Sequence, residues 1–179
     1  TAVARSVHSN WSGYLSDKQQ FGREAQRAGV EGSIVPRTFE TAAEAAEALS
    51  ERGGLAFVKS RFGAGGQDVL PILVEDLPGL ELPRDHIIQE GVLELALQRG
   101  RKFVIRAYLV AHGGALHLSR HALVIAHGAA YDANSASYDI HVKHAGYMDK
   151  GSEIKLFPLS KLEGSDVDGP ALFDAIVDA

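Results

Sequence analysis

Short apolar runs separated by polar turns predict several β-strands in this chain. The clearest pattern lies at residues 102–110, where Lys102, Val104, Arg106 and Tyr108 share one face at a period of two. Two glycines after this segment predict a hairpin turn. The expected strands cover residues 34–39, 55–58, 69–72, 87–92, 102–110, 116–120, 122–126 and 138–144.

Three helices are predicted from the residues at their boundaries. Ser16 or Asp17 can cap the first helix, which should end before Gly29. Thr41 caps a second, alanine-rich helix that ends at 53–54. A third helix opens at 169–170, and its apolar face is formed by Leu172, Phe173, Ile176 and Val177.

The composition is that of a soluble globular protein. The chain has 179 residues, of which 45% are hydrophobic, enough for the core of one domain or two small ones. A net charge of −5 without a basic run argues against nucleic acid as a partner. Cysteine is absent, which excludes disulfides and thiolate sites. Because no run approaches the ~20 apolar residues of a membrane span and no signal peptide is evident, we expect a cytoplasmic protein without a membrane partner.

The stretch from Leu55 to Ile72 predicts a strand, a glycine-rich loop and a second strand. Lys59 closes the first strand, and Gly63, Gly65 and Gly66 allow the backbone to turn its N–H groups toward an anion. Neither a P-loop nor a Rossmann fingerprint fits, because the glycines precede a strand and not a helix. A kinase or an ATP-grasp enzyme holds ATP phosphates with such a loop. The alternative is an ordinary hairpin with an exposed lysine.

Other charged residues extend this hypothesis. Lys102 and Arg106 together with Lys59 would suit a polyphosphate, although the first two could equally belong to a solvated sheet face. His141 and His144 would point to opposite faces of a strand and make a poor chelating pair. No serine lies in a GxSxG elbow, so a hydrolase triad is not indicated.

Taken in order, these residues resemble the tubulin–tyrosine ligase-like group of ATP-grasp ligases. The similarity runs from Asp17 to His144 and includes the SDK helix start, IVPRTF, FVKSRFGAGGQDV, IIQEGV and GRKFVIRAYLV. The family's glycine-loop pattern, K-S-x-x-G-A-x-G, is met by Lys59, Ser60, Gly63, Ala64 and Gly66.

The resemblance implies an α+β ATP-grasp fold with three segments. These are an entry segment at 1–40, a small lobe with the glycine loop at 41–92, and an incomplete large lobe at 93–179. It also implies ATP and Mg²⁺ as cofactors. The implied nucleotide-binding residues are Lys18, Lys59, Ser60, Gly63, Ala64, Gly65, Gly66, Lys102 and the hinge Gln89, Glu90, Gly91 and Val92, whose backbone would read adenine. The implied catalytic residues are Arg106, facing the transferred phosphoryl group, and Arg120, in place of a lost arginine.

The chain departs from the family pattern at several positions. Val104 stands where the family has aspartate, Ile125 where it has arginine, and the HLTN-like motif is HVKH at 141–144, in which Lys143 is a candidate phosphate ligand. The family's metal-binding carboxylates and asparagine lie on strands beyond a helix such as the one at 169–179. The chain is therefore expected to be either a fragment or a truncated relative without a metal site.

The function expected from the resemblance is that of an ATP-dependent carboxylate–amine ligase. Such an enzyme forms an acyl-phosphate from a carboxylate and ATP, and an amine then displaces phosphate, so an amino acid or peptide is the expected substrate. The alternative is a nucleotide-binding pseudoenzyme or regulatory module, which the altered positions at Val104, Ile125 and Lys143-His144 keep open. The identity of the two substrates and the oligomeric state are left open by the sequence.

Overall fold

The computed structural model describes residues 16–66 and 68–178, which belong to two compact units. Unit 1 runs to Leu93 and includes Ala133–Ala136. Unit 2 comprises Glu94–Asp132 and the described chain from Ser137 onward. The protein is of mixed α+β class, and its named strands all pair antiparallel. No helix in the described ranges has the length and apolar character needed to cross a membrane.

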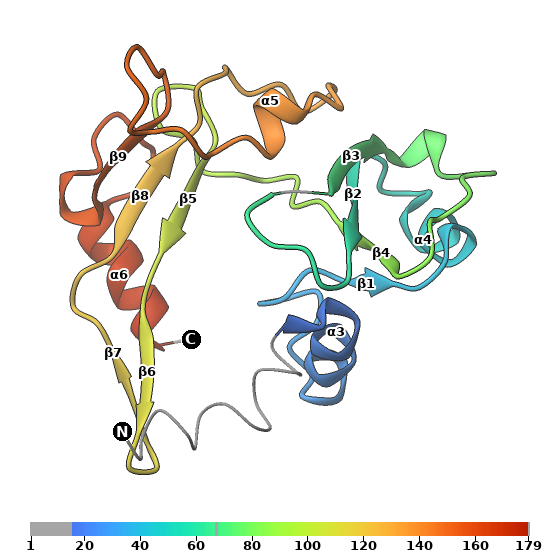
Figure 1. Cartoon of the computed structure of the whole chain (residues 1–179), viewed down its shortest axis with the longest axis horizontal. Helices are drawn as coiled ribbons and strands as arrows, with labels where there is room; N and C mark the ends of the chain where they lie inside the picture. The colour runs from blue at the N-terminus through green and yellow to red at the C-terminus, as the bar shows by residue number, and fades with distance from the viewer. Residues whose placement is uncertain (1–15, 67, 179) are drawn as a thin grey trace. The chain divides into compact units, whose positions relative to one another are not determined.

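Unit 1 is built on a four-stranded sheet in the order β1-β4-β2-β3. Its strands are β1 (Thr38–Phe39), β2 (Leu55–Ser60), β3 (Val69–Leu73) and β4 (His86–Glu90). The short 3-10 turn η1 (Val74–Asp76) directly follows β3. Helix α3 (Lys18–Arg27) precedes the sheet, and helix α4 (Ala42–Leu49) covers one of its faces (Figure 1).

Side-chain alternation along β2 gives the sheet two different faces. Ala56 and Val58 are buried and pack with Leu49 of α4 into one hydrophobic core. Phe57 and Lys59 point the other way and are only partly buried. Gln89 lies directly opposite Phe57 in β4, so it joins them on this second face. The second face therefore carries the polar side chains of Lys59 and Gln89.

The two helices of unit 1 begin at the residues that the sequence indicated. Asp17 caps α3, because its side chain accepts from the backbone N–H of Gln19 at 3.0 Å. Thr41 and Glu44 form a reciprocal capping box at the start of α4. These predictions are confirmed, and so are the strands expected at 55–58 and 69–72.

Unit 2 contains a three-stranded sheet in the order β5-β8-β9 and a separate hairpin. Its strands are β5 (Phe103–Arg106), β8 (Leu123–Ala126) and β9 (Lys155–Pro158). Helix α6 (Gly169–Asp178) and the 3-10 turn η2 (Leu159–Lys161) pack near the core residues Val124 and Leu159. The hairpin consists of β6 (Leu109–His112) and β7 (Ala115–Leu118), and a short helix α5 (Tyr138–His141) follows β8 (Figure 1).

Several sequence expectations are wrong or incomplete. The strand predicted at 102–110 is two strands, because β5 pairs with β8 whereas β6 pairs only with β7. Residues 138–141 form a helical turn, which the ion pair between Lys143 Nζ and Asp139 Oδ1 at 3.0 Å supports. Strand β9 was not foreseen, and only Thr38–Phe39 of the segment 34–39 forms a strand. Val177 is 56% exposed, so it does not belong to the packed face of α6.

Gly91, at the end of β4, has no room for a side chain. A Cβ there would lie 2.3 Å from the carbonyl oxygen of Leu55, which accepts the Gly91 N–H at 2.8 Å. Gly91→Ala should therefore lower the free energy of unfolding by about 2–3 kcal/mol, since the backbone must shift. Urea unfolding followed by circular dichroism measures this. The control is the exposed neighbour Val92, and Val92→Ala should change the free energy of unfolding by less than about 0.5 kcal/mol. Equal losses of stability in both variants would contradict the steric explanation.

Candidate functional site

The glycine loop connects β2 to β3 and is fixed at its base by backbone hydrogen bonds. The Ser60 N–H donates to the Asp68 carbonyl at 3.1 Å, and the Arg61 N–H donates to the Asp85 carbonyl at 2.9 Å. Gly65 and Gly66 adopt φ values of 67° and 79°, which residues with a Cβ rarely reach. The predicted loop between two strands is thus present, and its conformation needs glycine at positions 65 and 66.

The start of α3 is attached to this loop by two charged residues. Lys18 Nζ donates to the carbonyl oxygens of Ser60 at 2.9 Å, Arg61 at 3.3 Å and Gly63. The buried Asp17 carboxylate pairs with the Arg61 guanidinium, with Nη2–Oδ2 at 2.5 Å. Arg61 holds the pKa of Asp17 below its ordinary value, and burial lowers the pKa of Lys18.

Lys59 lies at the end of β2 on the second face of the sheet. Its Nζ donates to Gln89 Oε1 at 2.6 Å and lies 5.4 Å from the centre of the Phe57 ring. The hydrogen bond and the ring contact orient the ammonium along this face. Two residues predicted for nucleotide binding from different parts of the chain are therefore in direct contact.

The predicted hinge has fewer available backbone groups than expected. The N–H of Gly91 is bonded to Leu55, and its carbonyl oxygen accepts from Arg52 Nη2 at 3.0 Å. The buried Glu90 carboxylate pairs with Arg37, with Nε–Oε2 at 2.8 Å, and with Arg52. Both backbone groups of Gly91 are therefore engaged within the protein. A small cavity of about 150 Å³ lies beside 90–92.

The predicted residues of unit 2 have different surroundings. Lys102 Nζ donates to the His141 carbonyl at 3.1 Å, and burial lowers its pKa. Arg106 is exposed at the end of β5. Arg120 is exposed beside a groove of about 490 Å³ that Phe173 of α6 also lines. That Lys102 and Arg106 of unit 2 meet Lys59 of unit 1 at one polyphosphate stays a prediction.

Val104 and Ile125 are directly opposite each other in the β5–β8 ladder. They are the two positions at which the resemblance would place aspartate and arginine. Ile125 is 1% exposed, and Val104 is partly buried. The two departures therefore form one apolar cross-strand pair, and neither leaves an isolated buried charge.

His127 was missed by the sequence reasoning. It is 1% exposed, its Nδ1 lies 2.9 Å from the Ile140 carbonyl, and its Nε2 has no hydrogen-bond partner among the described residues. Burial lowers its pKa to about 4, and the nearby charge of Lys102 acts in the same direction. The only local signal was a polar residue that directly follows a buried strand.

The histidines do not form a metal site in the described ranges. His141 is on a helical turn and not on a strand, and its Nε2 lies 3.2 Å from the Asp132 carbonyl. His144 stacks on His127 with ring centroids 5.9 Å apart. Within residues 16–66 and 68–178, no group of three or more histidine, aspartate or glutamate residues is arranged to hold a metal ion.

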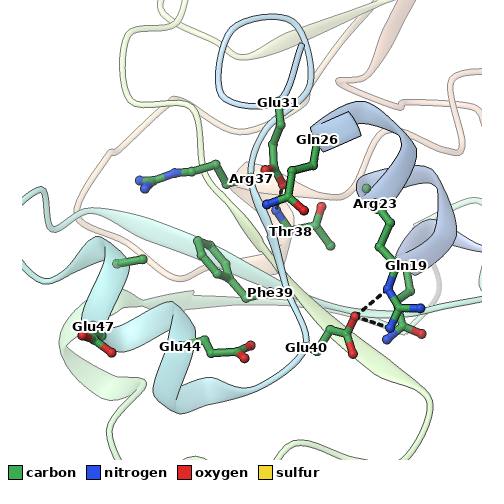
Figure 2. Close-up of a pocket in the computed structure, with 12 residues that line it drawn as sticks. Gln19, Arg23, Gln26, Glu31, Arg37, Thr38, Phe39, Glu40, Glu44 and Glu47 are labelled. Atoms are coloured by element: carbon green, nitrogen blue, oxygen red, sulfur yellow. Dashed lines mark hydrogen bonds and ion pairs between the residues drawn. The ribbon is translucent and has the colours of Figure 1, made fainter. Parts of the chain in front are cut away.

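A larger groove, of about 580 Å³, lies along β1 between α3 and α4. Figure 2 shows Arg23 of α3 paired with Glu40, with Nη2–Oε1 at 2.5 Å. Glu31 accepts the Thr38 N–H at 3.1 Å. No residue predicted to bind nucleotide lines this groove, so it lends no support to that prediction.

Comparison of the whole sequence with known proteins gave no identification. No protein family matches the chain, and no curated protein matches it.

The low pKa of His127 predicts a pH-dependent stability. Because the folded value, about 4, lies below the ordinary value of 6.5, the unfolded chain takes up a proton first as the pH falls. Stability should therefore be full above pH 6.5 and decrease toward pH 4, by up to about 3 kcal/mol from this residue. His127→Gln can keep an N–H donor for the Ile140 carbonyl without the titration. Urea unfolding at about pH 7 and about pH 4.5 should show a smaller pH effect in the variant; parallel behaviour of the two proteins would refute this.

Proposed function

We propose that this chain is an ATP-dependent carboxylate–amine ligase in which unit 1 binds the phosphates of ATP. The observation that carries the proposal is the combination of the β2–loop–β3 turn with Lys59. The lysine lies beside the loop on the sheet face that α4 does not cover, in contact with Gln89. A glycine loop and an oriented ammonium on the same sheet are suited to binding a polyphosphate, because backbone N–H groups and a cation can both contact its oxygens.

The reaction follows from the resemblance and needs two steps. A carboxylate oxygen of the first substrate attacks the γ-phosphorus of ATP, ADP leaves, and an acyl-phosphate forms. An amine then attacks the acyl carbon, inorganic phosphate leaves, and the nitrogen loses a proton to give an amide. An amino acid or peptide would supply the amine or the carboxylate. Catalysis of this kind depends mainly on positioning and on stabilising negative charge.

The resemblance implies Mg²⁺, which would help to neutralise the negative charge of the phosphates. The described residues offer no cluster of carboxylates or histidines for it. The residues of this chain that could act on the phosphoryl group are cations. Arg106 is the strongest of them, because it is exposed at the end of β5.

A nucleotide-binding module without catalysis is the second candidate. The paired Val104 and Ile125 favour it, because an apolar contact stands where the resemblance would require two charged groups. A chain that retains the glycine loop but lacks the two charged groups could still bind ATP as a structural or regulatory ligand.

Removing the Lys59 ammonium tests the binding proposal. Lys59→Ala should raise the Kd for ATP about 30-fold, equivalent to ~2 kcal/mol, which is the scale of a charge-assisted hydrogen bond. Isothermal titration calorimetry measures this. Arg84→Ala, which removes an exposed cation from the same unit, is the control and should leave the Kd unchanged. Wild-type affinity in the Lys59 variant would exclude the phosphate contact.

Arg106 separates the two candidate functions. If the protein is a ligase, Arg106→Ala should lower kcat at least about 100-fold with little change in the Kd for ATP, because its contact forms with the transferred group. ADP release with candidate amino acids and carboxylates is the assay, and Lys150→Ala, another exposed cation of unit 2, is the control. Tight ATP binding by the wild type without any turnover would instead favour the binding module.

A further inference from the structure

Lys18 uses all the donors of its ammonium group on the backbone of the glycine loop. A lysine ammonium has three N–H donors, and three carbonyl oxygens surround it, those of Ser60, Arg61 and Gly63. The Lys18 backbone N–H also donates to the Arg61 carbonyl, at 3.1 Å. The side chain is partly buried, and burial lowers its pKa while the neighbouring Asp17 carboxylate raises it. The three carbonyls therefore replace water around a charge that is costly to desolvate.

These contacts fix the orientation of the loop peptides. In a trans peptide the C=O and the following N–H point in opposite directions. The Ser60 carbonyl points to Lys18, and the N–H of the same peptide, that of Arg61, donates to Asp85 on the other side. By the same geometry, the Arg61 and Gly63 carbonyls turn the N–H groups of Phe62 and Ala64 away from Lys18.

We propose that Lys18 is a positioning residue whose ammonium is the resident cation of a carbonyl cage formed by Ser60, Arg61 and Gly63. In this role Lys18 sets the direction of the loop N–H groups and does not itself contact phosphate. The cage is independent of any ligand. Its importance for ATP rests on the proposed function, because the Phe62 and Ala64 N–H groups would then face the phosphates. This differs from the direct nucleotide contact that the resemblance implies for Lys18.

Chemical rescue tests the cage directly. Lys18→Ala leaves three carbonyl oxygens without their cation, whereas Lys18→Met retains the stem and removes only the donors. Hydrogen exchange at the Lys18, Ser60 and Arg61 amides, read by NMR, reports the cage, since these N–H groups bond to the Arg61, Asp68 and Asp85 carbonyls. We expect exchange at these amides to be roughly tenfold faster in both variants.

Methylammonium at about 100 mM should restore most of the protection in Lys18→Ala by mass action. It should not do so in Lys18→Met, because the methionine stem fills the space. Tetramethylammonium, which has no N–H donor, is the matched salt and should restore nothing. Unchanged exchange in both variants, or equal effects of the two salts on Lys18→Ala, would overturn the proposal. If Lys18→Ala does not fold, the exchange rates of Lys18→Met test the proposal. Wild-type protection of the three amides in Lys18→Met would then contradict it.

ATP binding by the same variants separates this inference from the proposed function. Methylammonium should lower the Kd for ATP of Lys18→Ala along with the exchange rates. If rescue of exchange is seen but the wild type binds no ATP, the cage is upheld and the nucleotide proposal fails. If Lys18→Ala weakens ATP binding while the three amides keep wild-type protection, Lys18 contacts phosphate and the positioning role is wrong.

Discussion

The ion pair between Asp17 and Arg61 is the contact on which the glycine-loop end of unit 1 depends. It joins the N-cap of α3 to the residue that follows β2, two positions more than forty residues apart, and Asp17 is only 4% exposed. Removing Arg61 would leave the buried Asp17 carboxylate without its charged partner, and only the N–H groups of the helix start would remain to satisfy it. Asp17 also caps α3, so one side chain fixes both the helix start and its distance from the loop. Lys18, the next residue, contacts the carbonyl oxygens of Ser60, Arg61 and Gly63.

Unit 2 presents a different balance of charge. The face of β5 that carries Arg106 also carries Val104, and Ile125 is packed opposite Val104. Lys102 is engaged with the His141 carbonyl, and His127 remains neutral beside it because burial disfavours a second positive charge. A ligase would have to stabilise its transferred phosphoryl group mainly with the exposed Arg106 and Arg120. A binding module would need neither. The apolar Val104–Ile125 pair is therefore the feature that weighs most against catalysis, and the exposed arginines are the features that keep it possible.

The sequence predicted those features that depend on neighbouring residues. Asp17 and Thr41 were identifiable as helix caps, and the runs at 55–58 and 69–72 as strands, because capping and apolar length are local properties. The strand predicted at 138–144 was wrong, because a short alternating run does not distinguish a strand from a helical turn. Strand β9 contains a lysine and a proline and gains its stability from pairing with β8, which no local pattern reports.

Within the candidate site, the position of Lys59 was predictable. The partners of Lys18, the bonded state of Gly91 and the burial of His127 were not, because each depends on residues distant in the sequence.

The geometry of a glycine loop between two antiparallel strands explains why a cation is needed behind it. In a P-loop the N-terminus of the following helix directs several N–H groups toward the phosphate. A strand that follows the loop offers no such alignment, because strand N–H groups alternate in direction and the sheet has only a small net dipole. Glycines with positive φ, such as Gly65 and Gly66, permit many backbone orientations and select none. A lysine that binds three carbonyls on one side of the loop makes that selection, since every carbonyl turned toward it turns an N–H away. In the proposed function, Lys18 therefore shapes the loop, and Lys59 is the second cation, which would meet the ligand.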